Sequence, residues 1–295
     1  MINPFVTIII PTYNDWTRLN LCLAALANQT YQQEFFEVIV VNNNPNDKLP
    51  DSCFIPENCK VINEHKPGSY AARNAALKIA KGEIVGFTDS DCIPDKNWIK
   101  HALDFFDQNQ EIKRIGGAVN IFFKKKNPSK IELYDKLFAF PQEAYVRSGN
   151  AVTANMFTYK YIFDKIGLFN ESLMSGGDYQ WGMLAHRNSF PIGYAPNAIV
   201  KHPARPSIKE LVNKAKRVGK GQAKFKSYQE ESIYATTVRI LKLLKPSLWE
   251  IKKVFAKGRD MNLSSKLFLI CLRHYIVWVE GFSKVKNERR VRRVS

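Results

Sequence analysis

Short apolar runs alternate with amphipathic segments over the first 90 residues. Residues 5–10 form an unbroken run rich in β-branched side chains that stops at Pro11, which is typical of a strand buried on both faces. Comparable runs predict strands over 35–41, 60–63 and 83–88, and an alanine-rich segment predicts a helix over 70–80. Because these elements alternate through short loops, we expect an α/β fold with a mostly parallel sheet and flanking helices. Ligands of such sheets bind at the carboxyl ends of the strands.

The pattern becomes less regular after residue 91 and changes again near residue 205. The middle of the chain predicts helices over 95–106 and 161–166, strands over 115–123 and 152–156, a turn over 124–128 and a loop over 139–150. From residue 207 onward, apolar positions follow a helical period among basic residues, over about 208–226, 232–244, 247–257 and 264–284. We therefore expect two domains, a sheet-containing domain over 1–205 and a C-terminal basic helical extension over 206–295.

Charge divides the chain at nearly the same place. The protein has 295 residues, and its 44 Lys and Arg against 27 Asp and Glu give a formal net charge of +17. Residues 1–200 contain 20 basic and 20 acidic side chains, whereas residues 201–295 contain 24 basic and 7 acidic ones. The excess positive charge therefore belongs to the expected extension. A hydrophobic content of 45% is enough for a sizeable core and excludes a disordered chain.

The composition also argues against several classes of protein. The chain has no stretch of 18 or more uninterrupted apolar residues, so we do not expect a transmembrane helix. Its first residues lack the basic and apolar regions of a cleaved signal. The five cysteines are scattered and form neither a CxxC pair nor a zinc-type cluster, which favours reduced thiols in a cytosolic compartment.

Two carboxylates, Asp89 and Asp91, directly follow the strand predicted over 83–88. On an extended segment alternate side chains point the same way, so both carboxylates can face one hard cation. Mg²⁺ and Mn²⁺ are usually held by one or two carboxylates together with substrate phosphates. The residues alone leave two interpretations open, a metal site and an ordinary solvated turn or helix cap.

Six short motifs then occur in a fixed order: Val6-Thr7-Ile8-Ile9-Ile10-Pro11-Thr12-Tyr13-Asn14; Gly68 with Ala72-Arg73-Asn74; residues 82–91, ending in Asp89-Ser90-Asp91; Gly116-Gly117; residues 167–171 with Gly176-Gly177-Asp178; and residues 196–202, ending at His202. In this order, over residues 5–202, they resemble the catalytic domain of the family-2 glycosyltransferases, which has a GT-A, Rossmann-like fold. The resemblance implies transfer of a sugar from a nucleoside diphosphate, expected to be UDP, to an acceptor hydroxyl, with inversion at the anomeric carbon. It also implies a divalent cofactor, Mn²⁺ or Mg²⁺.

The resemblance assigns roles to the acids and to one histidine. Asp91 is the implied metal ligand, Asp89 contacts the ribose or metal-bound water, and His202 completes the coordination. A lone surface histidine is the alternative interpretation of His202. Asp178 is the implied general base, although the family more often has Glu-Asp where this chain has Gly177-Asp178. A helix N-cap is the alternative role of Asp178.

The implied nucleotide contacts come from the end of the first strand and from the 70–80 helix. Pro11, Thr12 and Tyr13 would hold or stack the base, and Arg73 would reach base or phosphate unless it is a surface ion-pair partner. Asn43 is the implied base contact, although the family commonly has an Asp pair where this chain has three asparagines. An amide both donates and accepts, so uracil remains readable.

A further group of residues falls in segments that shape the donor-sugar and acceptor pocket in the family: Gly117, Asn155, Gly177 and Trp181. An aromatic face suits a pyranose ring, and a position in the core is the alternative for Trp181.

The expected extension combines aromatic side chains with lysines and arginines. We favour docking on an anionic membrane surface, with a solvated basic face as the second interpretation and binding of nucleic acid or another polyanion as the least favoured. Docking would place the protein in the cytoplasm, peripherally on the inner face of the membrane, with a glycan or lipid-linked acceptor.

Two other functions fit part of the pattern. One is a catalytically silent module that binds a sugar nucleotide or a membrane. The other is a sugar-nucleotide pyrophosphorylase, but the Gly-rich loop with Arg and Lys expected after its first strand is absent here.

Overall fold

The computed structural model describes residues 3–225, 232, 234–235, 238 and 245–292, with side chains as far as residue 288. The chain forms two compact units. The sheet unit consists of Met1–Asn120 and Phe140–Pro203, and the helical unit consists of Ile121–Ala139 and Ala204–Ser295. The division expected near residue 205 therefore leaves out one segment. Residues 121–139 belong to the helical unit, although they lie between the two segments of the sheet unit. We call this segment the excursion.

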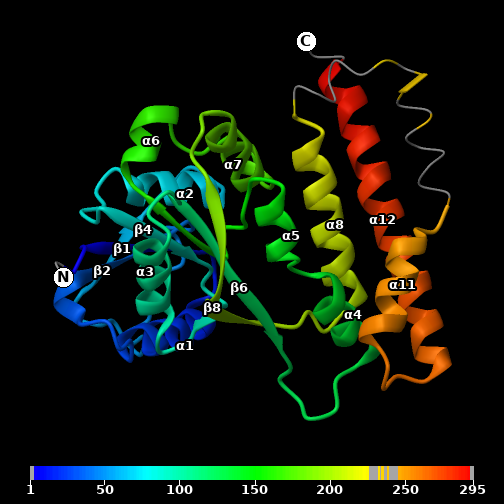
Figure 1. Cartoon of the computed structure of the whole chain (residues 1–295), viewed down its shortest axis with the longest axis horizontal. Coiled ribbons are helices and arrows are strands. Elements are labelled where there is room, and N and C mark those ends of the chain that lie inside the picture. Colours follow the sequence, from blue (N-terminus) through cyan, green and yellow to red (C-terminus); the bar gives the residue numbers. More distant parts are fainter. Residues whose placement is uncertain (1–2, 226–231, 233, 236–237, 239–244, 293–295) are drawn as a thin grey trace. The chain divides into compact units, whose positions relative to one another are not determined.

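Eight strands of the described residues form one sheet in the order β3-β2-β1-β4-β7-β6-β8-β5 (Figure 1). Their bounds are β1 Val6–Thr12, β2 Phe36–Asn42, β3 Cys59–Asn63, β4 Ile84–Thr88, β5 Ile93–Pro94, β6 Arg114–Phe122, β7 Asn155–Tyr159 and β8 Ile192–Pro203. The pairs among β3, β2, β1 and β4 are parallel, whereas β4–β7, β6–β7 and β5–β8 are antiparallel. The expected α/β fold is confirmed, and its parallel part is the half built from the first four strands.

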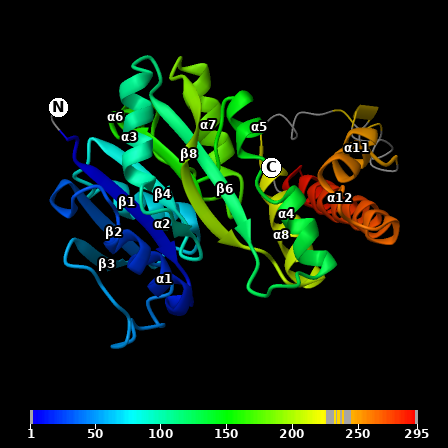
Figure 2. The ribbon, with the colours of Figure 1, turned by 60° about the horizontal axis from the view of Figure 1, so that its bottom comes forward.

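Helices cover both faces of this sheet (Figure 2). The helices of the sheet unit are α1 Trp16–Ala27, α2 Ser69–Leu77, α3 Trp98–Gln108, α5 Gln142–Arg147, α6 Tyr161–Ile166 and α7 Gly177–Arg187, with a short 3-10 turn over Gln33–Phe35. The buried leucines of α1, Leu19, Leu23 and Leu26, and the aromatic residues of α3 pack with Ile8 and Ile10 of β1 in one core cluster. On the other face, Phe87 of β4 contacts the rings of Phe163 and Phe169. Each fully buried leucine of α1 contributes about 1.5–3 kcal/mol of hydrophobic stabilisation.

Two helices were not expected from the sequence. Residues 139–150, predicted as a loop, contain α5, whose buried Gln142 donates to the carbonyl of Asn155 at 2.8 Å and accepts from the amide of Val152 at 3.0 Å. These bonds span ten or more residues, so no local pattern predicts them. Helix α4, Lys130–Phe138, begins with a capping box in which the side chains of Ser129 and Glu132 bond each other's amides. That signal is present in the sequence.

The helical unit contains α4, α8 Ile208–Gln222, α11 Leu248–Lys257 and α12 Leu263–Arg292. Its core is formed by Tyr134, Leu211, Ala215, Val254, Leu269, Leu272 and Ile276. Gly219 allows close packing of α8 on α12, because a Cβ there would lie 2.3 Å from the carbonyl oxygen of Glu280. Most of the helix expected over 232–244 lies outside the described residues. Among the described helices, none is both long and apolar enough to cross a membrane.

The two units differ sharply in charge. The residues of the helical unit include 28 basic and nine acidic side chains, whereas those of the sheet unit include 16 basic and 18 acidic ones. The excursion over 121–139 adds five lysines to the helical unit. The positive charge is therefore concentrated still more strongly than the linear sequence indicates.

Candidate active site

Asn43, at the end of β2, orders the turn that leads into α2. Its amide nitrogen donates to the carbonyls of Glu64 and Lys66 at 2.9 and 2.8 Å, and its Oδ1 accepts from the amide of Gly68 at 2.7 Å. Gly68 has a φ of 122°, a conformation that L side chains rarely adopt. Because these bonds use both donors of the Asn43 amide inside the protein, its expected role as a base contact is corrected to that of a structural link.

Helix α2 carries three polar side chains that reach three different segments. The hydroxyl of Tyr70 donates to Asp178 at 2.9 Å, and Nη2 of Arg73 donates to Asp89 at 2.6 Å. Asn74 bonds both backbone groups of Phe169. Arg73 is 3% exposed, so it is not the surface residue considered from the sequence; its ion pair joins a buried guanidinium to a partly exposed acid after β4.

The two acids after β4 have different partners. The amide of Cys92 donates to the carbonyl of Asp89 at 3.0 Å, so this segment is a turn rather than the extended strand assumed from the sequence. Asp89 faces Arg73, whereas Asp91 lies 3.3 Å from Nη1 of Arg18 and 3.5 Å from Nε2 of His202. The turn thus directs the two carboxylates toward separate cationic or imidazole groups.

His202 lies in β8 and is 4% exposed, so it is not a surface histidine. Its Nδ1 lies 2.7 Å from the carbonyl oxygen of Pro203. A carbonyl only accepts, so Nδ1 carries the hydrogen of this bond and Nε2 is directed toward Asp91. A carboxylate oxygen and an imidazole nitrogen that face one another are a donor set that suits Mn²⁺, and a backbone contact of the other ring nitrogen is usual for a ligating histidine.

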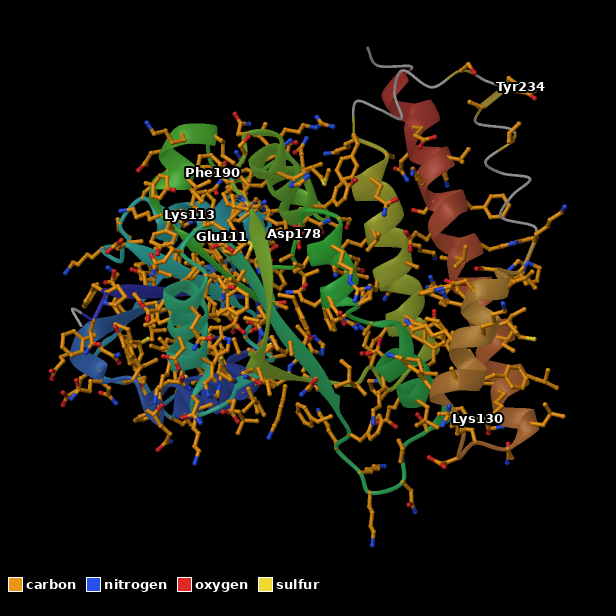
Figure 3. All side chains as sticks on the ribbon, viewed as in Figure 1. Glu111, Lys113, Lys130, Asp178, Phe190 and Tyr234 are labelled. Carbon is orange, nitrogen blue, oxygen red and sulfur yellow. The ribbon has the colours of Figure 1, made fainter. Side chains whose placement is uncertain are left out.

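Asp178 lies in the first turn of α7 and is partly exposed (Figure 3). Its Oδ1 accepts from the hydroxyl of Tyr70 and from the amide of Tyr179, both at 2.9 Å, and its Oδ2 accepts from the amide of Thr153 at 3.4 Å. The N-cap of α7 is Gly176, with a left-handed φ of 82°, so the helix-cap role considered for Asp178 is wrong. The arrangement leaves a carboxylate fixed at the edge of the sheet unit and accessible to solvent.

Three of the residues expected to line a sugar pocket lie in the core. Asn155 is fully buried and bonds Trp98 and the carbonyls of Ala118 and Ala198. Gly117 makes room for it, because a Cβ at Gly117 would lie 2.5 Å from the Asn155 amide nitrogen. The pocket roles of both residues are therefore corrected to structural ones.

The third is Trp181, which is 2% exposed and stacks on Phe163 with ring centroids 4.4 Å apart. Its indole donates to the carbonyl of Gly167 at 2.9 Å, so the ring is a core residue and not a sugar platform. Gly177, the fourth expected pocket residue, lies against the ring of Tyr70.

The end of β1 has buried polar atoms without partners. Pro11 is buried, Thr12 is 2% exposed and Tyr13 is 64% exposed. Among the described residues, Oγ1 of Thr12 and Nε1 of Trp16 have no hydrogen-bond partner. Unpaired buried polar atoms indicate a place for a ligand or water, and Trp16 is not among the site residues expected from the sequence.

A buried arginine, also not anticipated, fixes the helix that carries Asp178. Arg114 is fully buried and donates to the carbonyls of Gly149, Gly182 and Phe190. Burial lowers the pKa of its guanidinium to about 10. Because Gly182 belongs to α7, Arg114 ties this helix to β6 and to two loops.

Comparisons with known proteins agree with this architecture. The model of Glycosyl transferase family 2 matches residues 7–167. The chain is 33% identical over 225 residues to Glycosyltransferase AglE of Haloferax volcanii, which covers 74% of this chain and 73% of that protein.

Two solved structures share the fold. The mannosyltransferase PcManGT of Pyrobaculum calidifontis, in complex with GDP-Man and Mn²⁺, is 17% identical with a TM-score of 0.62, over 97% of this chain and 87% of that one. TarS 1-349 of S. aureus, in complex with UDP-GlcNAc, is 20% identical with a TM-score of 0.53, over 99% and 92%. These likenesses confirm the expected GT-A type of fold. Together with the match over more than half of the sequence, they lead to one assignment: the chain belongs to glycosyl transferase family 2 and is a glycosyltransferase.

Proposed function

We propose that the protein is an inverting, metal-dependent transferase that moves a sugar from a nucleoside-diphosphate sugar to the hydroxyl of a glycan or lipid-linked acceptor. The observation that carries the proposal is a set of polar contacts linked through α2 and through the turn that holds Asp89 and Asp91. These are the Asp91–His202 pair, the Arg73–Asp89 ion pair and the hydrogen bond from Tyr70 to the carboxylate of Asp178. The GDP-Man and UDP-GlcNAc complexes of the two structural neighbours support a nucleotide-sugar donor, and we take UDP as the carrier.

The nucleotide would bind at the carboxyl end of β1. Tyr13, with its exposed ring, is available to stack on the base, and the unpaired Oγ1 of Thr12 and Nε1 of Trp16 are available to bond a ligand. Asp89 keeps its bond to Arg73 and would accept from the ribose. The amide of Asn43 acts indirectly by fixing the turn before α2.

The divalent cation would be held by Asp91 and His202. When bound, it neutralises the developing charge of the leaving diphosphate, an effect worth several kcal/mol in the transition state. Among the described residues no group of three or more His, Cys, Asp or Glu side chains is close enough to hold a metal, so phosphate oxygens and water would supply the other ligands. The Mn²⁺ in the PcManGT complex supports a divalent cation as cofactor.

Asp178 would act as general base. Its carboxylate takes the proton of the acceptor hydroxyl while that oxygen bonds to the anomeric carbon. The bond from this carbon to the diphosphate oxygen breaks, and the diphosphate leaves with the electron pair. Attack from the side opposite the diphosphate inverts the configuration. A positioned base typically contributes about 10²–10⁴-fold to the rate.

A transfer assay tests the proposal and separates it from its two alternatives. Purified protein is incubated with UDP- and GDP-linked sugars, Mn²⁺ and a lipid-linked or glycan acceptor, and both transfer and donor hydrolysis are measured. We expect one preferred donor, and we expect Asp178→Asn and Asp91→Asn to retain donor binding but to lose at least a hundredfold in rate. Donor binding without turnover by the wild type would indicate a silent module, and synthesis of the sugar nucleotide from a sugar phosphate and a nucleoside triphosphate would indicate a pyrophosphorylase.

We also propose that the helical unit docks on an anionic membrane surface, peripherally on the cytoplasmic face. An exposed apolar stripe at i, i+4 spacing runs along α12, formed by Leu263, Leu267, Cys271 and Tyr275 and continued by Phe282. Exposed apolar side chains also begin α11, where Leu248 is 74% and Trp249 67% exposed. An apolar stripe within a unit of strong positive charge is the combination that binds anionic lipid headgroups.

Docking would bring the sheet unit, which carries the candidate active site, to acceptors carried by lipids. The same surface explains why we favour a lipid-linked or membrane-bound glycan acceptor over a free oligosaccharide. The nucleic-acid interpretation gains no support from the fold, because the exposed stripe of α12 is apolar rather than basic.

A further inference from the structure

The side chains of Tyr70 and Asp178 are 108 residues apart in sequence and are joined by a hydrogen bond beside Gly177. Tyr70 lies in the first turn of α2, is 4% exposed, and its hydroxyl donates to Oδ1 of Asp178 at 2.9 Å. Gly177 lies against the tyrosine ring: a Cβ on Gly177 would be 2.8 Å from its Cδ2 and Cε2 atoms. The ring can therefore take this place only because residue 177 has no side chain.

The two oxygens of Asp178 are bound unequally. Oδ1 accepts two short bonds, from the Tyr70 hydroxyl and the Tyr179 amide, whereas Oδ2 accepts among the described residues a single long bond of 3.4 Å from Thr153. An oxygen that already accepts two hydrogen bonds has its lone pairs engaged. Oδ2 is thus the oxygen with capacity to take a proton.

The tyrosine is suited to remain a donor. Burial, followed by the negative charge of Asp178, raises the pKa of the Tyr70 hydroxyl far above its usual value. It therefore keeps its proton throughout the neutral range, and the hydrogen bond to Oδ1 does not invert. The ring is further held by Phe169, whose centroid is 5.7 Å away.

We propose that Tyr70 is a positioning residue for the base: it holds Oδ1 of Asp178 so that Oδ2 faces the acceptor and receives its proton. This inference rests on the proposed function. In the step, the acceptor O–H bond breaks, its proton goes to Oδ2, the new bond forms between the acceptor oxygen and the anomeric carbon, and the diphosphate leaves with the electrons of the broken C–O bond. Gly177 is the position that admits the tyrosine.

The position of Tyr70 also links the base to the donor side of the site. Arg73 follows Tyr70 by three residues on α2, its guanidinium lies 5.7 Å from the tyrosine ring, and it binds Asp89. One helix therefore sets the positions of the carboxylate that takes the proton and of the acid expected to contact the nucleotide.

The first test is Tyr70→Phe, which removes the hydroxyl and keeps the ring. We expect kcat to fall about tenfold, the loss typical of one hydrogen bond to a charged group, while KM for the donor stays within about twofold. The matched control is Tyr161→Phe, which removes a hydroxyl from a tyrosine that is 41% exposed on α6. A wild-type kcat in Tyr70→Phe, or an equal loss of kcat and donor affinity, would overturn the proposal.

A double-mutant cycle tests the role of the glycine. Gly177→Ala pushes the ring away from Asp178, so we expect kcat to fall at least as far as in Tyr70→Phe. In the Tyr70→Phe background, Gly177→Ala should lower kcat less than threefold, because the hydrogen bond is already lost. Fully additive losses would contradict the proposal, since they would mean that Gly177 and the Tyr70 hydroxyl act independently.

Asp178→Asn separates failure of this inference from failure of the proposed function. If Asp178→Asn keeps wild-type transfer, Asp178 is not the base and both fail. If Asp178→Asn is inactive and Tyr70→Phe is fully active, only the positioning role fails. Circular dichroism and thermal unfolding of each variant verify that the fold is retained.

Discussion

Nε2 of His202 lies 3.5 Å from Oδ2 of Asp91, although the two residues are more than one hundred positions apart. Because Nδ1 of the histidine faces the Pro203 carbonyl, the remaining nitrogen is directed to the acid. We therefore expect Asp91→Asn and His202→Gln each to weaken Mn²⁺ binding at least tenfold, since each removes one of the two proposed protein ligands. Binding is measured by electron paramagnetic resonance of free Mn²⁺ in the presence of UDP.

His65→Ala is the control for this measurement, because His65 is an exposed histidine of the same unit. It should bind Mn²⁺ as the wild type does. Unchanged affinity in both Asp91→Asn and His202→Gln would show that the cation is held elsewhere.

Arg114 is expected to be a major source of stability for the sheet unit. Arg114→Met leaves the carbonyls of Gly149, Gly182 and Phe190 without their donor, and a buried unsatisfied group costs about 1–3 kcal/mol. We predict a decrease of about 3 kcal/mol or more in the free energy of unfolding, measured with urea. Arg147→Met, which removes the exposed partner of Glu143, should change it by less than about 1 kcal/mol. Equal losses in the two variants would refute this role.

Lys214, on α8, should make the stability of the helical unit depend on pH. Its ammonium donates to the carbonyl of Ala139, and burial, with repulsion by Arg205, lowers its pKa to about 7. The unfolded chain has an ordinary lysine pKa near 10.4, so between about pH 7 and 10 the unfolded state binds more protons and stability rises with pH. Below pH 7 the partly buried lysine is charged, and the full loss of stability caused by its desolvation is present.

The variant Lys214→Met removes the loss of stability that comes from desolvating the Lys214 ammonium. We expect its melting temperature to exceed that of the wild type at pH 6, and the difference to shrink by pH 9. Lys216→Met, at an exposed position of the same helix, is the control and should show no such change. A difference for Lys214→Met that stays constant from pH 6 to 9 would argue against a shifted lysine.

Docking on lipid should depend on the apolar stripe of α12. Leu267 is 52% exposed in this stripe, and we expect Leu267→Glu to reduce sedimentation with anionic vesicles at least fivefold. Leu21→Glu provides a matched control, because Leu21 is 55% exposed on α1 of the sheet unit. Equal partitioning of the wild type to neutral and anionic vesicles, or to neither, would exclude this docking.

The cysteines supply a second measurement of docking. Cys271 is the exposed thiol in the stripe, whereas Cys22 and Cys92 are buried and burial raises the pKa of both thiols well above the usual value. A polarity-sensitive maleimide should therefore react fastest at Cys271. Its emission should shift to shorter wavelength when anionic vesicles are added.

Local sequence patterns predicted much of this fold because the corresponding forces are local. The unbroken apolar run of β1 follows from burial on both faces, and the end of α6 at Gly167, with a φ of 87°, follows from a conformation that favours glycine. Helix α5 could not be found in the same way, since it is stabilised by the long-range bonds of Gln142.

Candidate site residues could be predicted from the sequence where the proposed chemistry requires a particular type of side chain. The residues around Asp91 leave a metal site and an ordinary turn open, the family resemblance implies the metal role, and the contact of Asp91 with His202 agrees with that role. Tyr70 and Arg114 were missed because a tyrosine on a helix and an arginine on a strand carry no local signal of their partners. The pocket role expected for Trp181 is wrong because an aromatic ring suits a sugar-binding surface and a hydrophobic core equally well, and this ring is in the core.

The helical unit is built from two separate segments of the chain, and this affects its folding during synthesis on the ribosome. Helix α4 is complete by residue 138, but the core residues that cover its Tyr134 come from α8 and α12, which begin at Ile208 and Leu263. At about 5–20 residues per second, the apolar side of α4 would wait roughly ten seconds for α12, and the sheet unit is completed at Pro203, about halfway through this wait. Nascent chains halted after Pro203 and before Leu263 should therefore be held by chaperones through residues 121–139, although the sheet unit is by then complete.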